Sequence, residues 1–294
     1  MNRIVRSLLA AAGAAILAVV GPSNILAANP TFTTIDFPGA ILTFSYGVNP
    51  SGDIVGVYLA APPPTGDGKG HGYLLSGGEF TTIDVPGASF TAASDINARG
   101  DIVGWDIGAD GKLHGFLLSG GEFTTIDPPG AIQTGPFLGI NSRGDIVGGY
   151  IDAAKRQHGF LLSGGQFTTI DVPGATGTTA PSVNPRGDIV GGYIDAAKKE
   201  HGYLLSGGEF TTIDFPDASF TRANGINAHG DIVGSYGTAG KQHGYLLSGG
   251  QFNTIDFPNA TLTAAVKINP RGEIVGNYLD VEGKGHGFLL GKSE

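Results

Sequence analysis

The chain has 294 residues, among them 51 glycines and no cysteine, and its 26 acidic residues outnumber its 17 basic ones. The net charge of −9 repels nucleic acid and anionic lipid, so we expect neither as a partner. A chain without cysteine cannot rely on disulfides, so it has to bury a hydrophobic core of its own, for which residues 29–294 are sufficient.

Residues 1–28 differ from the rest of the chain. Arg3 and Arg6 form a short basic end, Leu8–Val20 is an apolar run, and small residues surround Ala27. This run is too short to cross a bilayer, and the order of features is typical of a signal peptide. We therefore expect residues 1–28 to be removed and the mature protein to be secreted, extracellular or periplasmic, without membrane insertion.

Three strings each recur six times at a spacing close to 43 residues, apart from an insertion at Pro62–Gly68. They are Gly-Asp-Ile-Val-Gly (Glu for Asp in the last copy), His-Gly-Tyr/Phe-Leu-Leu, and Phe-Thr-Thr-Ile-Asp (Phe-Asn-Thr-Ile-Asp once). A fixed period of this length is typical of a propeller, a solenoid or a linear array.

Within one period, every signal indicates a strand or a turn. Asn184-Pro185-Arg186-Gly187 fits a type I turn after the first strand, and Asp188–Tyr193 is rich in β-branched residues. His201–Leu205 and Phe210–Asp214 are the next strands, and the two glycines between them suit a tight hairpin. Each period therefore predicts four short strands, which is one propeller blade.

The repeats do not start and stop at the same point. The repeat region begins with a lone fourth strand, Phe32–Asp36, and its last repeat ends after a third strand, His286–Leu290. We therefore predict an all-β fold in a single domain over residues 29–294. It is a six-bladed β-propeller of four-stranded blades, closed by the N-terminal strand that completes the last blade.

The repeated histidine and the aspartate of the following strand are predicted to face each other across the hairpin. The pairs are His71 with Asp84, His114 with Asp127, His158 with Asp171, His201 with Asp214, His243 with Asp256 and His286 with Asp36. A His–Asp pair is two-thirds of a nucleophilic triad, but no activated nucleophile accompanies it. The histidines also lie too far apart around a ring to share one metal. We interpret the pairs as structural and expect no catalytic residue, metal or cofactor.

A ligand site should instead appear where the six-fold pattern breaks. Trp105 and Asp106 replace the residue pair that ends in tyrosine in the other five repeats. Asp95 and Lys267 stand where other innermost strands have glycine or serine, and Asp67 lies in the insertion. These five residues are the candidate ligand-binding set, with Asp95 and Lys267 the only charged lining of a central channel. In the alternative interpretation, Trp105 fills space between blades.

The sequence resembles the bacterial extracellular HAF-repeat proteins. The counterparts of their motifs are Gly225-Ile226-Asn227, Asp231-Ile232-Val233-Gly234 and His243-Gly244-Tyr245-Leu246. Glycine replaces alanine after the histidine, and no tryptophan follows the leucines. The resemblance spans Phe32 to Leu290. It implies an exported repeat protein with a propeller-like fold, and it implies no activity.

Three classes of function follow. The first is a secreted, non-enzymatic binding or scaffold module for an extracellular glycan or protein. The alternative is an extracellular enzyme acting on polysaccharide, a hydrolase or lyase, with its site in one sector of the ring. The third is a structural envelope or matrix protein that associates with itself without a ligand.

Overall fold

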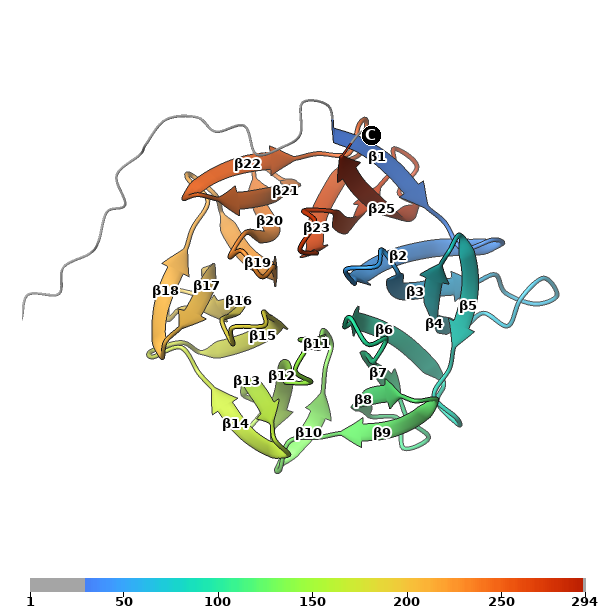
Figure 1. The fold of residues 1–294 in the computed structure, drawn as a ribbon, viewed down its shortest axis with the longest axis horizontal. Helices are drawn as coiled ribbons and strands as arrows, with labels where there is room; N and C mark the ends of the chain where they lie inside the picture. Colours follow the sequence, from blue (N-terminus) through green and yellow to red (C-terminus); the bar gives the residue numbers. More distant parts are fainter. Residues whose placement is uncertain (1–29, 293–294) are drawn as a thin grey trace, which may run out of the picture.

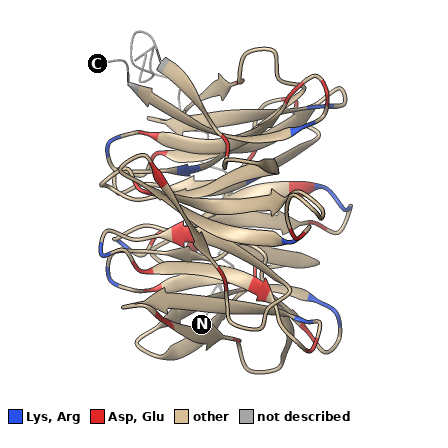
Figure 2. Ribbon diagram, turned by 90° about the vertical axis from the view of Figure 1, so that its right-hand side faces the viewer, with Lys and Arg blue, Asp and Glu red and all other residues tan. Residues whose placement is uncertain are grey.

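The computed structural model describes residues 30–292, and every element in this range is a strand. The predicted signal peptide lies outside the described residues. The strands form sheets arranged radially around a central axis, which is an all-β propeller (Figure 1). Among the described residues, no helix long and apolar enough for a transmembrane span is present. Most of the charged residues lie in the loops and at strand ends (Figure 2).

Four sheets have four strands each. From the axis outwards, the first contains β2 (Ala40–Val48), β3 (Ile54–Ala60), β4 (Gly70–Ser76) and β5 (Glu79–Ile83), and the second contains β6 (Phe90–Ile96), β7 (Ile102–Ile107), β8 (Leu113–Ser119) and β9 (Glu122–Ile126). The next contains β19 (Phe220–Ile226), β20 (Ile232–Thr238), β21 (Lys241–Ser248) and β22 (Gln251–Ile255). The last contains β23 (Leu262–Ile268), β24 (Ile274–Leu279), β25 (Gly285–Lys292) and β1 (Pro30–Ile35).

The third and fourth repeats depart from the predicted set of separate four-stranded sheets. They form one nine-stranded sheet, because β13 (Gln157–Ser163) and β15 (Gly177–Val183) are joined by a single parallel pair, Gln157 with Gly177. Its other strands are β10 (Ala131–Thr134), β11 (Gly139–Ile140), β12 (Ile146–Asp152), β14 (Gln166–Ile170), β16 (Ile189–Ile194), β17 (Glu200–Ser206) and β18 (Glu209–Ile213).

The innermost strand of the third repeat is also broken into β10 and β11. Between the buried Thr134 and Gly139 this repeat has four residues, whereas the first repeat has three between Thr43 and Gly47. The extra residue cannot fit the pleat, and Pro136 has no N–H for the ladder. The chain therefore leaves the sheet over residues 135–138 and rejoins it at β11.

The core consists of apolar clusters between neighbouring repeats. At one junction, Val55 and Ile83 pack against Ile96, Ile102 and Phe116. The alternation of side chains along each second strand explains the clusters, because residues two apart face the same neighbour. The second glycine of Gly-Asp-Ile-Val-Gly is required by close packing, since a Cβ at Gly191 would lie 1.9 Å from the Thr179 carbonyl oxygen.

The predicted ring closure is confirmed. β1 runs antiparallel to β25, from Pro30 opposite Lys292 to Ile35 opposite Gly287. It thereby supplies the outer strand of the sheet that otherwise holds β23, β24 and β25. The two ends of the described chain are thus neighbours in one sheet (Figure 1).

Candidate functional site: the central cavity

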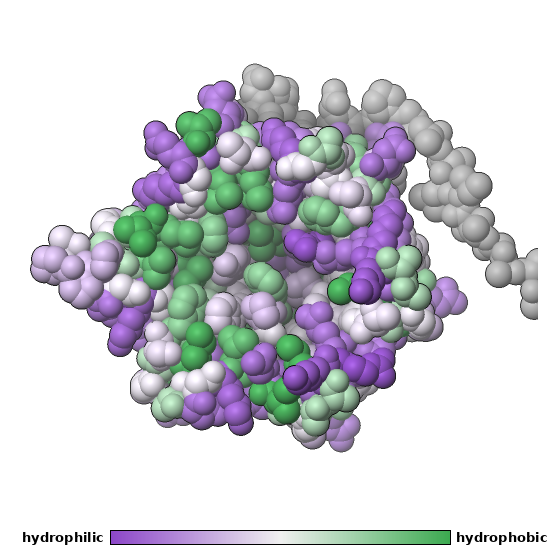
Figure 3. Space-filling view, turned by 180° about the vertical axis from the view of Figure 1, so that it is seen from behind, coloured by the Kyte–Doolittle hydropathy of each residue, from purple (hydrophilic) through white to green (hydrophobic). Residues whose placement is uncertain are grey.

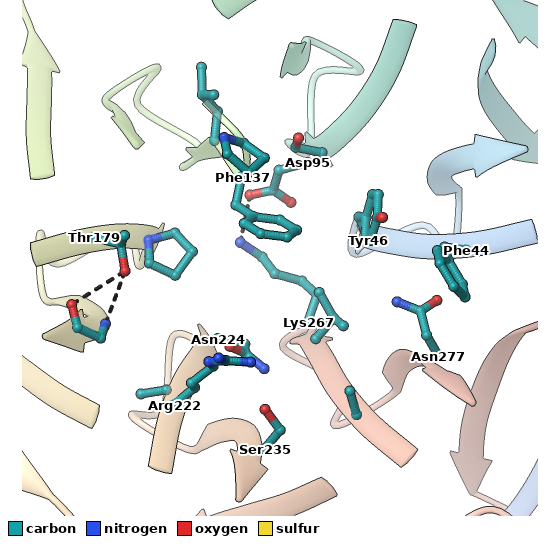
Figure 4. A pocket seen from close by; sticks show the side chains of 18 of the residues that line it. Phe44, Tyr46, Asp95, Phe137, Thr179, Arg222, Asn224, Ser235, Lys267 and Asn277 are labelled. Carbon is teal, nitrogen blue, oxygen red and sulfur yellow. Dashed lines mark hydrogen bonds and ion pairs between the residues drawn. The ribbon is translucent and has the colours of Figure 1, made fainter. Parts of the chain in front are cut away.

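A cavity of about 470 Å³ lies where the innermost strands meet, and we call it the central cavity. Figure 3 shows a hollow in the middle of one face of the ring, with hydrophobic residues gathered on one side of it and hydrophilic residues on another. The lining residues come from all six repeats, mainly from the first two strands of each. Figure 4 shows how their side chains converge.

One wall of the central cavity is aromatic. It contains Phe44 and Tyr46 from β2, and Pro136, Phe137 and Leu138 from the segment between β10 and β11. The ring of Phe137 is 5.8 Å from that of Tyr46 in an edge-to-face arrangement, and Phe137 is 47% exposed. Its φ of 73° lies in the left-handed region, where a bulky side chain is rare and strained. Strain of this kind, at a solvent-exposed aromatic residue, marks a candidate binding position.

Much of the remaining lining is polar. Arg222 of β19 donates two hydrogen bonds of 2.7 Å to the carboxylate of Glu200 on β17. The Asn224 side chain donates to the carbonyl oxygen of Ala265 at 2.9 Å. Asn277 of β24 accepts a hydrogen bond of 2.7 Å from the backbone N–H of Ser45. These contacts hold the side chains in place before any ligand arrives.

The floor of the cavity is an ion pair across the axis. Lys267 of β23 donates from Nζ to Asp95 Oδ2 at 2.5 Å and to Ser182 Oγ at 2.9 Å. Asp95 also accepts from the backbone N–H groups of Ile96 and Ile140. Burial raises the pKa of the Asp95 carboxyl, and the Lys267 ammonium and these two donors oppose that effect. The contacts join the second, third, fourth and sixth repeats at the axis.

The prediction that Asp95 and Lys267 lie in the channel is confirmed, but they are not its only charged lining. Glu200 and Arg222 line the same cavity. The prediction considered only the positions directly before each Ile-Asn or Val-Asn. Arg222 lies three residues earlier in β19, and Glu200 begins β17, the third strand of its repeat, so neither was among the positions considered.

The structure does not bring Trp105, Asp106 and Asp67 together with this pair. Trp105 and Asp106 are consecutive in β7, so their side chains point to opposite faces of the sheet. Trp105 stacks on Phe90 with ring centroids 4.9 Å apart, and a Cβ at Gly135 would lie 3.1 Å from the Trp105 Cβ. Asp67 lies elsewhere, with its Oδ1 atom 3.1 Å from His71 Nε2. Only Asp95 and Lys267 of the five candidates line the central cavity.

The six predicted His–Asp pairs are present, with Nδ1 of each histidine 2.7–2.9 Å from a carboxylate oxygen of its aspartate. Sequence analysis missed a second partner on Nε2. In five repeats this partner is another aspartate, at 3.1–3.3 Å: Asp67, Asp110, Asp152, Asp195 and Asp280. For His243 it is Thr238. A polar residue four to six positions before the histidine is the signal that could have revealed it.

The second repeat differs from the others at its histidine. Elsewhere a tyrosine stacks on the imidazole with centroids 4.8–5.1 Å apart, and Asp106 takes that position here. Burial raises the pKa of the Asp106 carboxyl, and the neighbouring His114 opposes this. The hydrogen bond to Asp127 raises the pKa of His114, helped by Asp110 and opposed by burial. Among residues 30–292, however, no group of three or more His, Asp or Glu side chains is arranged to hold a metal ion.

The residues that sequence analysis missed in the cavity include Tyr46, Phe137, Arg222, Ser235 and Asn277. Ser235 and Asn277 occupy the same position of the repeat as Trp105. Comparing this position across all six repeats, instead of only in the second, would have found them. The one-residue excess in the third repeat was the available signal for Phe137.

No family model matches the chain, and no curated protein matches it. Solved propellers are similar in fold. The propeller domain of the Trilobed protease from Pyrococcus furiosus, described as having an open velcro topology, is 10% identical, with a TM-score of 0.54 over 86% of this chain and 95% of that one. A mutant of AofleA from Arthrobotrys oligospora is 14% identical, with a TM-score of 0.55 over 88% and 86%. The fucose-specific lectin from Aleuria aurantia is 13% identical, with a TM-score of 0.52 over 85% and 96%. At these identities the likeness concerns the propeller fold alone.

Proposed function

We propose that the protein is a secreted, non-enzymatic propeller, related to the HAF-repeat proteins, whose central cavity binds part of an extracellular glycan. A volume of about 470 Å³ is within the range of small-molecule sites, which combine apolar walls with a few polar groups that fix orientation. A sugar ring has an apolar face and a rim of hydroxyls, so it fits between an aromatic wall and a polar wall. The specificity named for the Aleuria lectin supports only the idea that a similar fold can hold a sugar.

The observation that carries this proposal is Phe137. An aromatic side chain that is 47% exposed, on a backbone with φ of 73°, is unfavourable both for solvation and for conformation. Such strain costs about 1–3 kcal/mol and clusters at active sites, ligand clamps and switch segments. Phe137 and Tyr46 together offer aromatic surface to a sugar ring at the mouth of the cavity.

An enzyme acting on polysaccharide is the weaker alternative. Glycoside hydrolysis commonly needs two carboxyl groups, of which one is protonated and the other is a free nucleophile or base. Both carboxylates that line the cavity are paired with cations, Asp95 with Lys267 and Glu200 with Arg222. Two carboxylates held in this way favour binding over acid–base chemistry.

We also infer that the ring functions as six blades, with the nine-stranded sheet counting as two. The two halves of this sheet are joined by a single pair of backbone partners, Gln157 and Gly177. Between them lies an apolar cluster that includes Val147, Ile170 and Tyr203. The next junction has Val190, Ile213 and Tyr245 at the equivalent repeat positions. The two halves therefore pack face to face as separate blades do.

A glycan array followed by calorimetry tests the binding function. The purified protein is screened against the array, and Phe137→Gly is then compared with the unchanged protein on the best glycan. We expect affinity to fall at least about tenfold, which corresponds to ~1.4 kcal/mol. The free energy of unfolding should hold or rise by about 1 kcal/mol, because glycine accepts a positive φ without strain.

Val281→Ala is the matched control, since Val281 is an apolar residue that is 75% exposed and does not line the cavity. It should leave affinity unchanged. An array without a specific glycan, or a Phe137→Gly variant that binds as well as the unchanged protein, would contradict the proposal. Release of reducing sugar from the bound glycan would favour the enzyme instead.

A further inference from the structure

The charges of the central cavity cancel each other. Its charged lining consists of Asp95, Glu200, Arg222 and Lys267, which form two ion pairs. The pairs leave no net charge to attract a carboxylate; the Glu200 and Arg222 side chains are 29% and 45% exposed, whereas the Asp95–Lys267 pair is buried. A carboxylate brought to this buried pair would lose its hydration beside Asp95 without gaining a cation of its own. The cavity therefore disfavours an acidic sugar and suits a neutral one.

Ser235 of β20 is a buried polar side chain directed into this cavity. The residue is 2% exposed, and Figure 4 shows its hydroxyl pointing towards the cavity centre. The buried side-chain atoms without a partner among the described residues are Ser94 Oγ, Trp105 Nε1 and Thr134 Oγ1, so the Ser235 hydroxyl is not one of these enclosed atoms. This hydroxyl faces the cavity, where it can exchange a water for a ligand hydroxyl. The third and fourth repeats have Gly149 and Gly192 at this position, so the fold itself does not require a serine here.

Asn277 lies at the same repeat position in the next sheet, on β24. Its Oδ1 accepts from the Ser45 N–H at 2.7 Å, so the amide is oriented and its NH2 group faces the cavity (Figure 4). Ser235 can both donate and accept, whereas the Asn277 NH2 only donates. Both can bond sugar hydroxyls from within the cavity, whose lining also includes Phe137.

We propose that the central cavity selects a neutral saccharide, whose hydroxyls are bound by Ser235 and Asn277 while its apolar face contacts Phe137. This inference rests on the proposed function and adds to it the class of sugar and the residues that determine specificity. Asn277 also holds the last sheet to the first through the Ser45 N–H, so a change of Asn277 would affect the ring as well as the sugar, and Ser235 is the residue to test.

The test uses two matched sets of probes: methyl glycosides of neutral hexoses and 6-deoxyhexoses, and methyl glycosides of the corresponding hexuronates. Binding to the full-length mature protein is measured by calorimetry or by ligand-observed NMR. The neutral glycosides should bind at least about tenfold more tightly than the hexuronates, because the latter bury an unpaired carboxylate. Ser235→Ala should weaken binding of the neutral glycoside about five- to tenfold, as expected for loss of one buried hydrogen bond.

Thr134→Val is the control for loss of a hydroxyl, because Thr134 has a buried hydroxyl without a partner among the described residues but does not line the cavity. It should leave saccharide affinity unchanged. Equal affinity for hexuronates, or unchanged affinity in Ser235→Ala while Phe137→Gly abolishes binding, would overturn this inference and leave the binding function standing. If no glycoside binds, or Phe137→Gly has no effect, the proposed function fails together with it.

Discussion

At the scale of single residues, one proline explains a buried hydroxyl without a partner. In five repeats the threonine of the innermost strand accepts a hydrogen bond from the backbone N–H six residues earlier, at 2.9–3.1 Å. In the third repeat the threonine is Thr134, and the residue six positions earlier is Pro128, which has no N–H. Thr134 Oγ1 is accordingly buried and unpaired within the described residues.

Pro128→Val should therefore stabilise the protein by about 1 kcal/mol, since it supplies the missing donor and outweighs the small loss of proline rigidity. Valine is the residue at this position in the second and fourth repeats, as Val85 and Val172. The sign should reverse in the background of Thr134→Val, where the new N–H would itself be unpaired. Urea unfolding of all four proteins in this double-mutant cycle measures the coupling. Additive effects would show that Pro128 does not explain the unpaired hydroxyl.

At the scale of elements, the turn after each innermost strand links one repeat to the next. The turn asparagine accepts two backbone N–H groups, as Asn141 does from Arg143 and Asp145 at 2.9 and 3.0 Å. Its NH2 group donates to Asp145 and to the carbonyl oxygen of Asn184 in the following repeat, at 2.8 and 3.1 Å. Equivalent contacts to a neighbouring repeat occur at Asn97, Asn184 and Asn269. The turn is thus also a contact between repeats.

Asn141→Ala should lower the free energy of unfolding by about 3 kcal/mol, because Asn141 is 3% exposed and takes part in four hydrogen bonds that alanine cannot replace. Ser142→Ala is the control in the same turn. Its side chain is exposed, and its carbonyl oxygen, which accepts from Arg99, is retained. A loss in Asn141→Ala no larger than in Ser142→Ala, measured by thermal and urea unfolding, would refute this role.

The elements that sequence analysis predicted well are those fixed by neighbouring residues. The Gly-Gly hairpins have positive φ at both glycines, as at Gly77 and Gly78. The position after the proline that follows each Ile-Asp is left-handed even where it is not glycine, with φ of 60° at Asp217 and 61° at Asn259. The central cavity could not be predicted in this way, because its walls depend on which repeats face each other across the axis. Strand alternation likewise separates Trp105 from Asp106 although they are adjacent in sequence.

At the scale of the whole molecule, closure of the ring depends on β1. Ile35 is 5% exposed and belongs to the apolar cluster between the last sheet and the first, which also includes Val48 and Val275. Phe32 packs edge-to-face on Phe257 and Phe288 with centroids 5.1 and 5.4 Å apart, in the preceding junction. β1 therefore contributes to both junctions of the last sheet and covers the edge of β25, which would otherwise be open to aggregation.

Deleting residues 30–36 should consequently destabilise the entire ring by several kcal/mol, since it removes two packed side chains and a ladder of backbone hydrogen bonds. Asp36→Ala is the matched control. It removes only the contact of 2.8 Å with His286, and the Asp36 side chain is 41% exposed, so this pair is worth at most about 1 kcal/mol. In urea unfolding the deletion should lower the midpoint far more than Asp36→Ala and should increase light scattering, because an unpaired strand edge is exposed. A deletion variant that unfolds at the midpoint of the intact protein would mean that the sheet of β23, β24 and β25 is stable without its outer strand. The ring would then be held by the axial contacts of Asp95 and Lys267 and by packing between repeats.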